Sequence, residues 1–552
     1  MKIKKHISVI LFLTTISLVA QIKIPESSFK KFKTLPKEQI FVHYNSNMVL
    51  TGESLLFKVY SLYRKTNTLS KLSKIAYIEL LDVNKKPILK RKILLKGGEG
   101  YGDIFISSKI KSGNYKLIAY TRWMKNTNSY FEDNILIINP FEKKISFNHQ
   151  TIKEKKEVYD FIYDTRSFVK INLKDLIDTD GKYSISIRKD NDGVLDKKKS
   201  PQNFYNLEKG TALSGTSVYL PEFRGQLIIG KITSVTNEKS VKNIKVGLSI
   251  LDNDRIFKIT STDNKGNFFF NIAEPFRSEK IFCKLINENK PNNYKISFPR
   301  EKELDFQDLS FSGPKTTNEI IKTINDRSIY IQIQNAYSEI TKDSIIQSIV
   351  DNSIFKDKVI KYNLDDYTRF NTIKETFVEI IENAWIGKKD GKYKVFVRDS
   401  ETITNFDFPP LIIVDGYIIT DYLEFLDINP KKIQSISLLR EKYKYNSKPY
   451  QGIISLKSKK GSYTPRAFKS MMAHSFLTTL PIKKYSHKKD LNNSNTRIPD
   501  FRTQLLWKPK VTSLNKNISF RTSDIKGKYI IEVQGFSKKG TPISIIKTLQ
   551  VK

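Results

Sequence analysis

Residue types that could support catalysis or metal binding are few in this chain, and they are widely separated. The chain has one cysteine, Cys283, and five histidines among its 552 residues. His43, His149, His474 and His487 never fall within metal-ligand spacing of one another, whereas a zinc site needs three or four convergent ligands. No GxSxG, P-loop or GxGxxG pattern occurs. The sequence therefore predicts no catalytic residue, no metal site and no cofactor.

Two weaker candidate sites have simpler structural interpretations. Cys283 lies in the alternating, strand-like segment 281–285 and has no assignable histidine partner that would activate it as a nucleophile. We therefore predict that it is a small buried residue. The side-chain oxygens of Asp252, Asn253 and Asp254 could bind calcium, but a solvated loop explains this run of polar residues more simply.

The formal charge of the chain is extreme, at +38, because 95 Lys and Arg outnumber 57 Asp and Glu. One interpretation is contact with an anionic partner, such as an outer-membrane surface, a polysaccharide or a nucleic acid. The lysines are spread along the whole chain, which favours a generally basic surface instead. No nucleic-acid-binding motif accompanies the charge, so we expect no nucleic-acid partner.

The N-terminus has the pattern of a secretory signal peptide. Three lysines within the first five residues precede a mostly apolar run at 7–20, which is too short to span a bilayer comfortably. We therefore predict a signal peptide at 1–20, followed by a polar lead-in at 21–37. No later run approaches 18 uninterrupted apolar residues, so we expect an exported, soluble chain.

The elements that would position any site are predicted to be mainly β, as several β-sandwich domains plus one small α+β domain. Tyr, Phe, Ile and Val are abundant, and residues 38–140 show six or seven short strand patterns separated by turn signals. That spacing predicts a β-sandwich. Its segments VLTGE at 49–53 and SGNYKLIAYT at 112–121 resemble the opening and closing motifs of the macroglobulin domain MG2.

Two further segments resemble macroglobulin sandwiches. Residues 141–222 include a strand pattern at 183–188 after an Asp-Gly turn, and we predict a second macroglobulin-like sandwich there. Residues 499–552 contain FRTSDIKGKYIIEVQG, which resembles a strand–turn–strand unit of that family. The basic, polar and proline-containing segment 464–498 is predicted to be a long surface linker.

Residues 223–300 resemble a carboxypeptidase regulatory-like domain, which is a small β-sandwich. The resemblance rests on the sequence TDNKGNFFF. Asp263 and Gly266 are expected to form the turn, and Phe268 and Phe270 are expected to enter the core. In that family the domain is a non-catalytic companion of carboxypeptidases, so the resemblance implies no zinc site.

A helix-containing connecting region is predicted at 301–400, with an amphipathic helix at 371–383. Residues 401–463 then contain a strand ending in Val-Asp-Gly, the run NPKKIQSI, and a strand that starts with Gly and ends in SKKG. This order resembles the plug domain of TonB-dependent outer-membrane receptors. The residues that carry the resemblance are Val414, Asp415, Gly416, Asn429, Pro430, Ile433, Gly452 and Gly461. Asp415 and Gly416 are interpreted as a tight turn.

The combination of modules predicts a protein that binds other proteins. The thioester of the protease-trapping macroglobulins is absent, because Cys283 is followed by Lys284 and Leu285. Too few residues follow Gly461 for the membrane barrel of a plugged transporter, which has about 22 strands. We expect a non-enzymatic protein, periplasmic or associated with the outer membrane, that acts in protein–protein association there.

The expected partners are envelope proteins, with an outer-membrane barrel as one candidate. Strand addition at a sheet edge is the binding mode that the β-rich composition favours. The alternative function is an accessory subunit of an outer-membrane TonB-dependent transport system.

Overall fold

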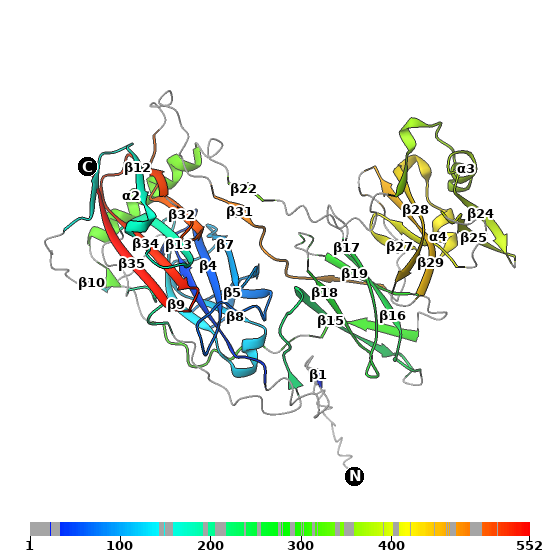
Figure 1. Ribbon diagram of the computed structural model, residues 1–552, viewed down its shortest axis with the longest axis horizontal. Coiled ribbons are helices and arrows are strands. Elements are labelled where there is room, and N and C mark those ends of the chain that lie inside the picture. The colour runs from blue at the N-terminus through cyan, green and yellow to red at the C-terminus, as the bar shows by residue number, and fades with distance from the viewer. Residues whose placement is uncertain are drawn as a thin grey trace, which may run out of the picture.

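The structure of the chain is a computed structural model. It describes residues 22–23, 34–142, 148–149, 158–190, 197–204, 217–236, 239–250, 256–273, 276, 278, 280–286, 293–299, 301, 303–311, 315–316, 318–336, 343–346, 358–389, 391–400, 408–419, 421–445, 448–459, 461, 463, 471–485, 499–515 and 517–552. The predicted signal peptide, the Asp252–Asp254 run and His487 lie outside these residues. Strands dominate the described chain, which confirms the prediction of a mainly β fold (Figure 1).

The first unit is a β-sandwich over residues 38–138, the region in which a sandwich is predicted. Its two sheets have the strand orders β2-β4-β7 and β3-β9-β8-β5-β6. The strands are β2 (Glu38–Tyr44), β3 (Met48–Leu50), β4 (Ser54–Tyr63), β5 (Ile75–Leu81), β6 (Pro87–Leu94), β7 (Glu99–Phe105), β8 (Gly113–Thr121) and β9 (Phe131–Ile138). Apolar side chains that alternate along both sheets meet in one core, in which Phe57, Ile78 and Leu117 are fully buried.

The second sandwich is assembled from two segments that are far apart in sequence. β13 (Gly181–Lys189) lies between β32 (Gln504–Val511) and β34 (Gly527–Ser537) in a sheet of order β11-β35-β34-β13-β32. The other strands are β11 (Phe161–Tyr163), β12 (Phe168–Asn172), β33 (Asn517–Arg521) and β35 (Pro542–Val551). The prediction of separate units at 141–222 and 499–552 is therefore wrong. Neither segment has enough strands to cover its own apolar face, so each completes the other.

The third sandwich contains the TDNKGNFFF turn. One sheet has the order β18-β15-β20 and the other β17-β16-β19-β30. The strands are β15 (Gln226–Ser234), β16 (Lys245–Ile250), β17 (Ile256–Ser261), β18 (Asn267–Ile272), β19 (Lys280–Ile286), β20 (Tyr294–Ser297) and β30 (Met471–Ser475). Asp263 Oδ1 accepts the backbone N–H groups of Lys265 and Asn267, both at 2.8 Å, while Phe268 and Phe270 are buried. The turn and the two core residues are as predicted.

Strand β30 comes from the segment that is predicted to be a surface linker. It pairs antiparallel with β19, so the linker prediction for 464–498 is wrong over residues 471–485. Further along, Leu480 N–H donates to Lys92 O of β6 at 2.8 Å, and Lys483 Nζ lies 2.9 Å from Asp103 Oδ2. The backbone of this segment finds hydrogen-bond partners on two sandwiches, which stabilises an extended path that its composition does not indicate. Residues 471–485 therefore tie the third sandwich to the first.

The fourth unit contains the plug-like residues and is α+β. Its sheet has the order β23-β28-β29-β26-β27, and a separate hairpin pairs β24 with β25. The elements are β23 (Val359–Asn363), α3 (Ile373–Glu379), β24 (Ala384–Lys389), β25 (Lys392–Val397), β26 (Leu411–Val414), β27 (Tyr417–Ile419), α4 (Tyr422–Leu426), β28 (Ile433–Tyr445) and β29 (Lys448–Ser458). The predicted boundary at 401 is wrong, because β23, α3, β24 and β25 share one core with the sheet. Helix α3 also ends four residues before the predicted end at 383.

The sheet of the fourth unit is buried on both faces, which explains the uninterrupted apolar run at 411–414. Ile412 and Val414 belong to the core that includes α3 and α4. Leu411 and Ile413 point the other way and pack with Ile286 of the third sandwich. Successive residues of a strand face opposite sides of a sheet, so a strand that is covered twice needs apolar residues at every position.

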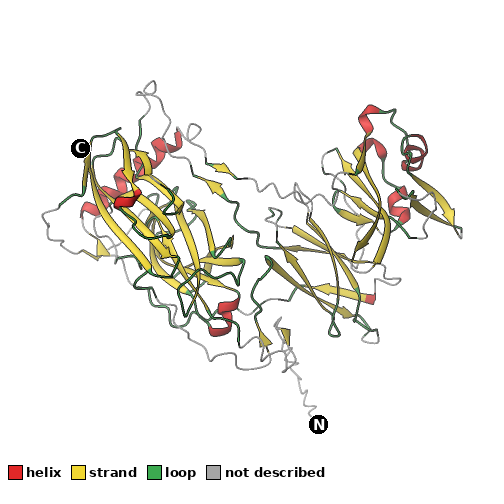
Figure 2. Cartoon of the chain, viewed as in Figure 1, coloured by secondary structure: helices red, strands yellow, loops and turns green. Residues whose placement is uncertain are grey.

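Helix α2 (Asn318–Ala336) lies against the first sandwich, with Ile324 and Ile331 on Met48. It spans two stretches that show only mixed periodicity in the sequence. Figure 2 shows it as the long red helix beside the strands at the left. Short pairs join β1 (Ile22–Lys23) to β14 (Ser217–Val218), β10 (Asn148–His149) to β21 (Lys315–Thr316) and β22 (Ser344–Ile345) to β31 (Lys483–Lys484). Within the described ranges, no helix has the length and apolar character needed to cross a membrane.

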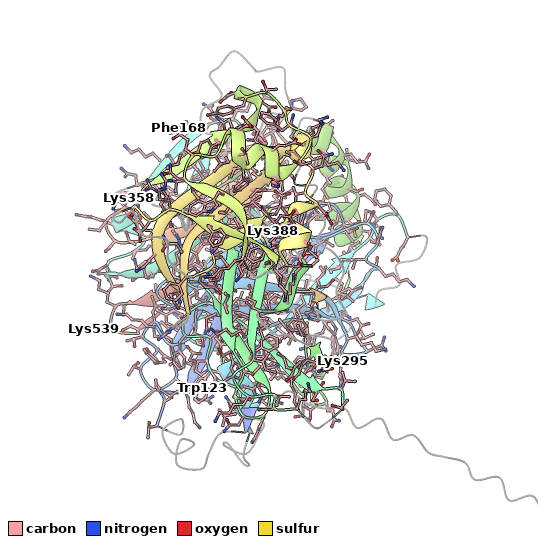
Figure 3. All side chains as sticks on the ribbon, turned by 90° about the vertical axis from the view of Figure 1, so that its right-hand side faces the viewer. Trp123, Phe168, Lys295, Lys358, Lys388 and Lys539 are labelled. Atoms are coloured by element: carbon pink, nitrogen blue, oxygen red, sulfur yellow. The ribbon has the colours of Figure 1, made fainter. Side chains whose placement is uncertain are left out.

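Basic residues project from different units of the structure. Figure 3 shows Lys295 of β20, Lys358 before β23, Lys388 of β24 and Lys539 after β34 in separate regions of the view. These positions match the dispersed distribution of lysine along the sequence.

Candidate functional site

The plug-like residues form one structural cluster at an end of the fourth unit's sheet. Asp415 and Gly416 have φ values of 48° and 86° and connect β26 to β27, with Val414 opposite Tyr417. Two consecutive positive φ values define a two-residue turn of the type in which Asp-Gly is preferred. The predicted tight turn is therefore present.

The Asp415 carboxylate holds the neighbouring end of β29. It accepts the backbone N–H groups of Ser458 at 2.8 Å and Tyr463 at 3.2 Å, and also the Ser458 hydroxyl. Asn429 Oδ1 caps the 3₁₀ turn Pro430–Lys432 through the Lys431 N–H at 2.9 Å.

The remaining motif residues also have backbone or packing roles. Ile433 is buried opposite Ser458, which places it near Gly461 at the end of the sheet that holds Asp415. Gly452 lies near the middle of β29, where an added Cβ would meet Leu439 O at 2.5 Å. The structure thus brings seven of the eight motif residues to one end of the sheet, whereas Gly452 lies within β29, away from that end. Turns, caps and core packing account for them, and no reactive group is presented.

We expect Asp415→Ala to destabilise the fourth unit by about 3 kcal/mol. Buried N–H groups lose their acceptor, at about 1–3 kcal/mol each, and alanine is disfavoured at this positive φ by about 1 kcal/mol. Asp415→Asn should cost less, because asparagine tolerates the turn and keeps one acceptor oxygen. Denaturant unfolding measures both, with the exposed Asp366→Ala as the control. Equal stability of the Ala variant and the unmodified chain would show that the hydrogen bonds of this carboxylate do not stabilise the end of β29.

A Ser–His–Glu cluster lies between the first and second sandwiches. His43 Nδ1 is 2.6 Å from Ser184 Oγ, and His43 Nε2 is 3.6 Å from Glu532 Oε2. The three residue types match a hydrolytic triad. His43 is 1% exposed and Ser184 is fully buried, and the ring of Trp507 packs 5.2 Å from the imidazole. A substrate has no path to Ser184 in this arrangement, so the cluster is not an active site. Because His43 belongs to the first sandwich and Ser184 and Glu532 to the second, the cluster instead joins the two domains.

The charges of this cluster are set by burial and by Lys198. Burial lowers the pKa of His43 more than the nearby Glu532 raises it, so the imidazole is neutral. Burial alone would raise the pKa of Glu532, but Lys198 and His43 together hold it at about 2. Lys198 Nζ forms an ion pair with Glu532 and donates to Tyr44 O at 2.8 Å.

The unfolding free energy should fall as the pH drops below about 6.5. The unfolded chain then protonates His43, whereas the folded chain, with its lowered pKa, does not. The contribution is absent at pH 7, where the imidazole is neutral in both states. One such group gives a slope of at most ~1.4 kcal/mol per pH unit. His43→Asn should flatten the stability profile between pH 6.5 and pH 5 in denaturant titrations, and an unchanged profile would contradict the burial of a neutral imidazole.

The other candidate residues of the sequence are not brought together. Cys283 is buried in the third sandwich, and burial raises the pKa of its thiol, as expected for a structural cysteine. His474 stacks on Phe298 with ring centroids 4.4 Å apart. Among the residues with described positions, no three His, Cys, Asp or Glu side chains are arranged to hold a metal ion.

A pocket of about 250 Å³, which we call the junction pocket, opens where the first sandwich, the second sandwich and α2 meet. The segment 45–56, from the loop before β3 to the start of β4, provides Asn45, Ser46, Val49, Gly52, Glu53, Ser54 and Leu56; β13 provides Arg188; α2 provides Arg327, Tyr330, Ile331, Gln334 and Asn335; and the residues leading into β32 provide Phe501, Arg502, Thr503 and Gln504. Four chain segments from distant parts of the sequence thus build one concave site.

Three arginines, Arg188, Arg327 and Arg502, line this pocket, and Arg327 pairs with Glu53, the one carboxylate of the lining. Arg327 Nε lies 3.2 Å from Glu53 Oε1, and its Nη2 lies 2.5 Å from Glu53 Oε2, which is a bidentate ion pair. Arg188 is only 7% exposed, and its one hydrogen bond within the described residues is a long contact of 3.5 Å to Met48 O. Burial, followed by repulsion from Arg327, lowers the pKa of Arg188 to about 9.

The other charged groups near Arg188 are already paired. Arg502 forms a bidentate contact with Asp500, at 2.7 and 2.8 Å. Asp190, which directly follows β13, pairs with Lys528 at 3.1 Å. The amide Nε2 of Gln334, also in the lining, is buried without a hydrogen-bond partner. The lining therefore presents N–H donors and one uncompensated positive charge.

Sequence reasoning places Arg188 only at the end of a predicted strand and gives it no role. The alternation in β13 puts Ser184, Ser186 and Arg188 on one face. Their polarity predicts that this face is exposed to solvent. All three are buried, because that face is covered by the first sandwich and α2. A buried arginine depends on pairings with β32 and β34 that a single sequence does not reveal.

No family model matches the chain, and no curated protein matches it. Solved structures that match include trypsin-activated alpha-2-macroglobulin from Escherichia coli, with 9% identity over 93% of this chain and 41% of that chain and a TM-score of 0.24. The native form of the E. coli protein matches with 10% identity, 94% and 40% coverage, and a TM-score of 0.25. Dimeric latent PorU from Porphyromonas gingivalis has 11% identity, 48% and 34% coverage, and a TM-score of 0.16. The chain spans about two fifths of the length of the two E. coli structures, and TM-scores of this size carry no argument about family or function.

Proposed function

We propose that this chain is an exported, non-enzymatic protein of the bacterial cell envelope that binds other proteins. The observation that carries the proposal is the junction pocket, which offers N–H donors and apolar walls but no nucleophile paired with a base. The Ser–His–Glu cluster that could have supported hydrolysis is sealed between two sandwiches. The lysine-rich, apolar N-terminus supports export, and the macroglobulin-like and plug-like sequence motifs support an envelope role.

Site-specific photo-crosslinking tests this function. A benzoylphenylalanine is placed at Asn335, an exposed residue on the pocket lining, and in a second chain at Lys388, an exposed residue of the β24–β25 hairpin. We expect a discrete envelope protein to cross-link in the producing bacterium at position 335 and not at 388. Capture of an outer-membrane barrel at 388 alone would replace this function by the accessory role in TonB-dependent transport. Turnover of a substrate by the purified chain would remove the non-enzymatic proposal.

A further inference from the structure

The junction pocket contains a buried cation that the protein does not neutralise. The guanidinium of Arg327 binds both carboxylate oxygens of Glu53. Arg188 therefore has no carboxylate partner among the described residues. A buried, unpaired charge lowers stability, whereas a buried pair with satisfied hydrogen bonds does not carry the same penalty. Such a group is best explained when a ligand supplies the missing anion.

The net charge and the hydrogen-bond donors of the pocket lining indicate which kind of anion would fit. After Glu53 neutralises Arg327, one positive charge remains, which matches a monoanion better than a doubly charged phosphate. A guanidinium presents two parallel N–H groups to a planar carboxylate, which is the geometry of the strongest arginine contacts. The unpaired Nε2 of Gln334 adds a neutral donor to the same lining.

The apolar walls and the volume of the pocket limit the size and polarity of the group that carries the bound carboxylate. Val49, Leu56 and Ile331 are apolar, and the rings of Tyr330 and Phe501 stack with centroids 5.1 Å apart. The volume of about 250 Å³ is below the range of about 300–1,000 Å³ that holds drug-sized ligands. One amino-acid residue therefore suits the pocket better than a longer segment.

We propose that the junction pocket binds a carboxylate carried by a small apolar group, as in the C-terminal residue of a peptide, with Arg188 as its bidentate partner. This inference rests on the proposed function, because it names the part of a partner that the pocket receives. A free small carboxylic acid has the same chemistry, and the arms of the experiment separate the two sources.

Fluorescence anisotropy on the full-length mature chain tests the site with a labelled tetrapeptide that ends in leucine. The comparison arms are the same peptide with an amidated terminus, an amidated peptide with an internal glutamate, N-acetyl-leucine as competitor and inorganic phosphate as competitor. We expect the free-terminus peptide to bind at least tenfold more tightly than its amide. Competition by N-acetyl-leucine at equal affinity assigns the site to small acids as well, whereas weaker competition assigns it to peptide termini, and both outcomes support a carboxylate site. Tighter binding of phosphate or of the internal-glutamate peptide would overturn the assignment.

Arg188→Gln supplies the decisive variant, with Arg224→Gln as its charge-matched control on an exposed surface. We expect Arg188→Gln to lose at least tenfold in peptide affinity while its melting temperature stays equal or rises, because a buried unpaired charge is removed. Arg224→Gln should change neither. Acetate should raise the melting temperature of the unmodified chain and not that of Arg188→Gln. Unchanged affinity in Arg188→Gln would overturn the proposal, and a lower melting temperature would show that Arg188 is structural.

The proposed function and this inference fail in different ways. Cross-linking at position 335 that persists in Arg188→Gln would leave the binding function in place and remove the carboxylate site. Peptide binding together with substrate turnover would keep the site and remove the non-enzymatic function.

Discussion

A chain that ends at residue 498 is expected to lose the whole second sandwich, including the part that it still contains. β11, β12 and β13 pair with β33, β34, β35 and β32, so their backbone N–H and C=O groups and one side of their core would become exposed. Three short strands without a covering layer are not independently stable. In hydrogen–deuterium exchange, residues 161–189 should exchange at the rate of an unfolded segment.

The matched comparison removes the inserted fourth unit instead. A chain in which a short Gly-Ser linker replaces residues 359–463 retains all seven strands of the second sandwich, and residues 161–189 should remain protected. If these residues were equally protected in the chain that ends at 498, the pairing of the two distant segments would be wrong.

Glu532→Ala is expected to cost about 3–5 kcal/mol of unfolding free energy, because one partner of a buried ion pair is removed and Lys198 is left unpaired. The carboxylate is 9% exposed and also accepts a hydrogen bond from the Gln534 amide. The loss should appear in the transition that separates the first and second sandwiches, since Lys198 also binds Tyr44 O of β2.

Glu303→Ala is the control for Glu532→Ala. Its carboxylate is 63% exposed and lies 3.7 Å from Lys90, and exposed pairs of this kind contribute about 0–1 kcal/mol. Chemical denaturation should therefore separate the two variants clearly. Similar small losses in both would mean that the contact between the sandwiches does not depend on the buried pair.

Local chemistry in the sequence was sufficient to predict several turns and cores. Asp415-Gly416 and the turn at Asp263 are specified by residues adjacent in the chain, and both turns form as predicted. The TDNKGNFFF motif, through its resemblance to the regulatory-like domain, likewise predicts core positions for Phe268 and Phe270, and both are buried. These features depend on neighbouring residues, so one sequence contains the information needed.

Features that depend on distant pairings were not predictable. The sequence predicts the strand at 183–188, but its partners β32 and β34 lie more than 300 residues further on. The polar face of β13 was therefore indistinguishable from a solvent-exposed face. The basic segment that contains β30 also gave no signal of pairing, because its partner β19 lies far earlier in the chain. The junction pocket combines four such distant segments, and so the sequence assigns no role to its arginines.

Hydrogen–deuterium exchange of the full-length chain, with and without the protein captured at position 335, tests the central claim most directly. We expect slower exchange on binding in residues 181–189, 318–336 and 501–507, which include Arg188 and other residues that line the junction pocket. Slower exchange confined to residues 359–463, or no change in the three pocket segments, would contradict that claim.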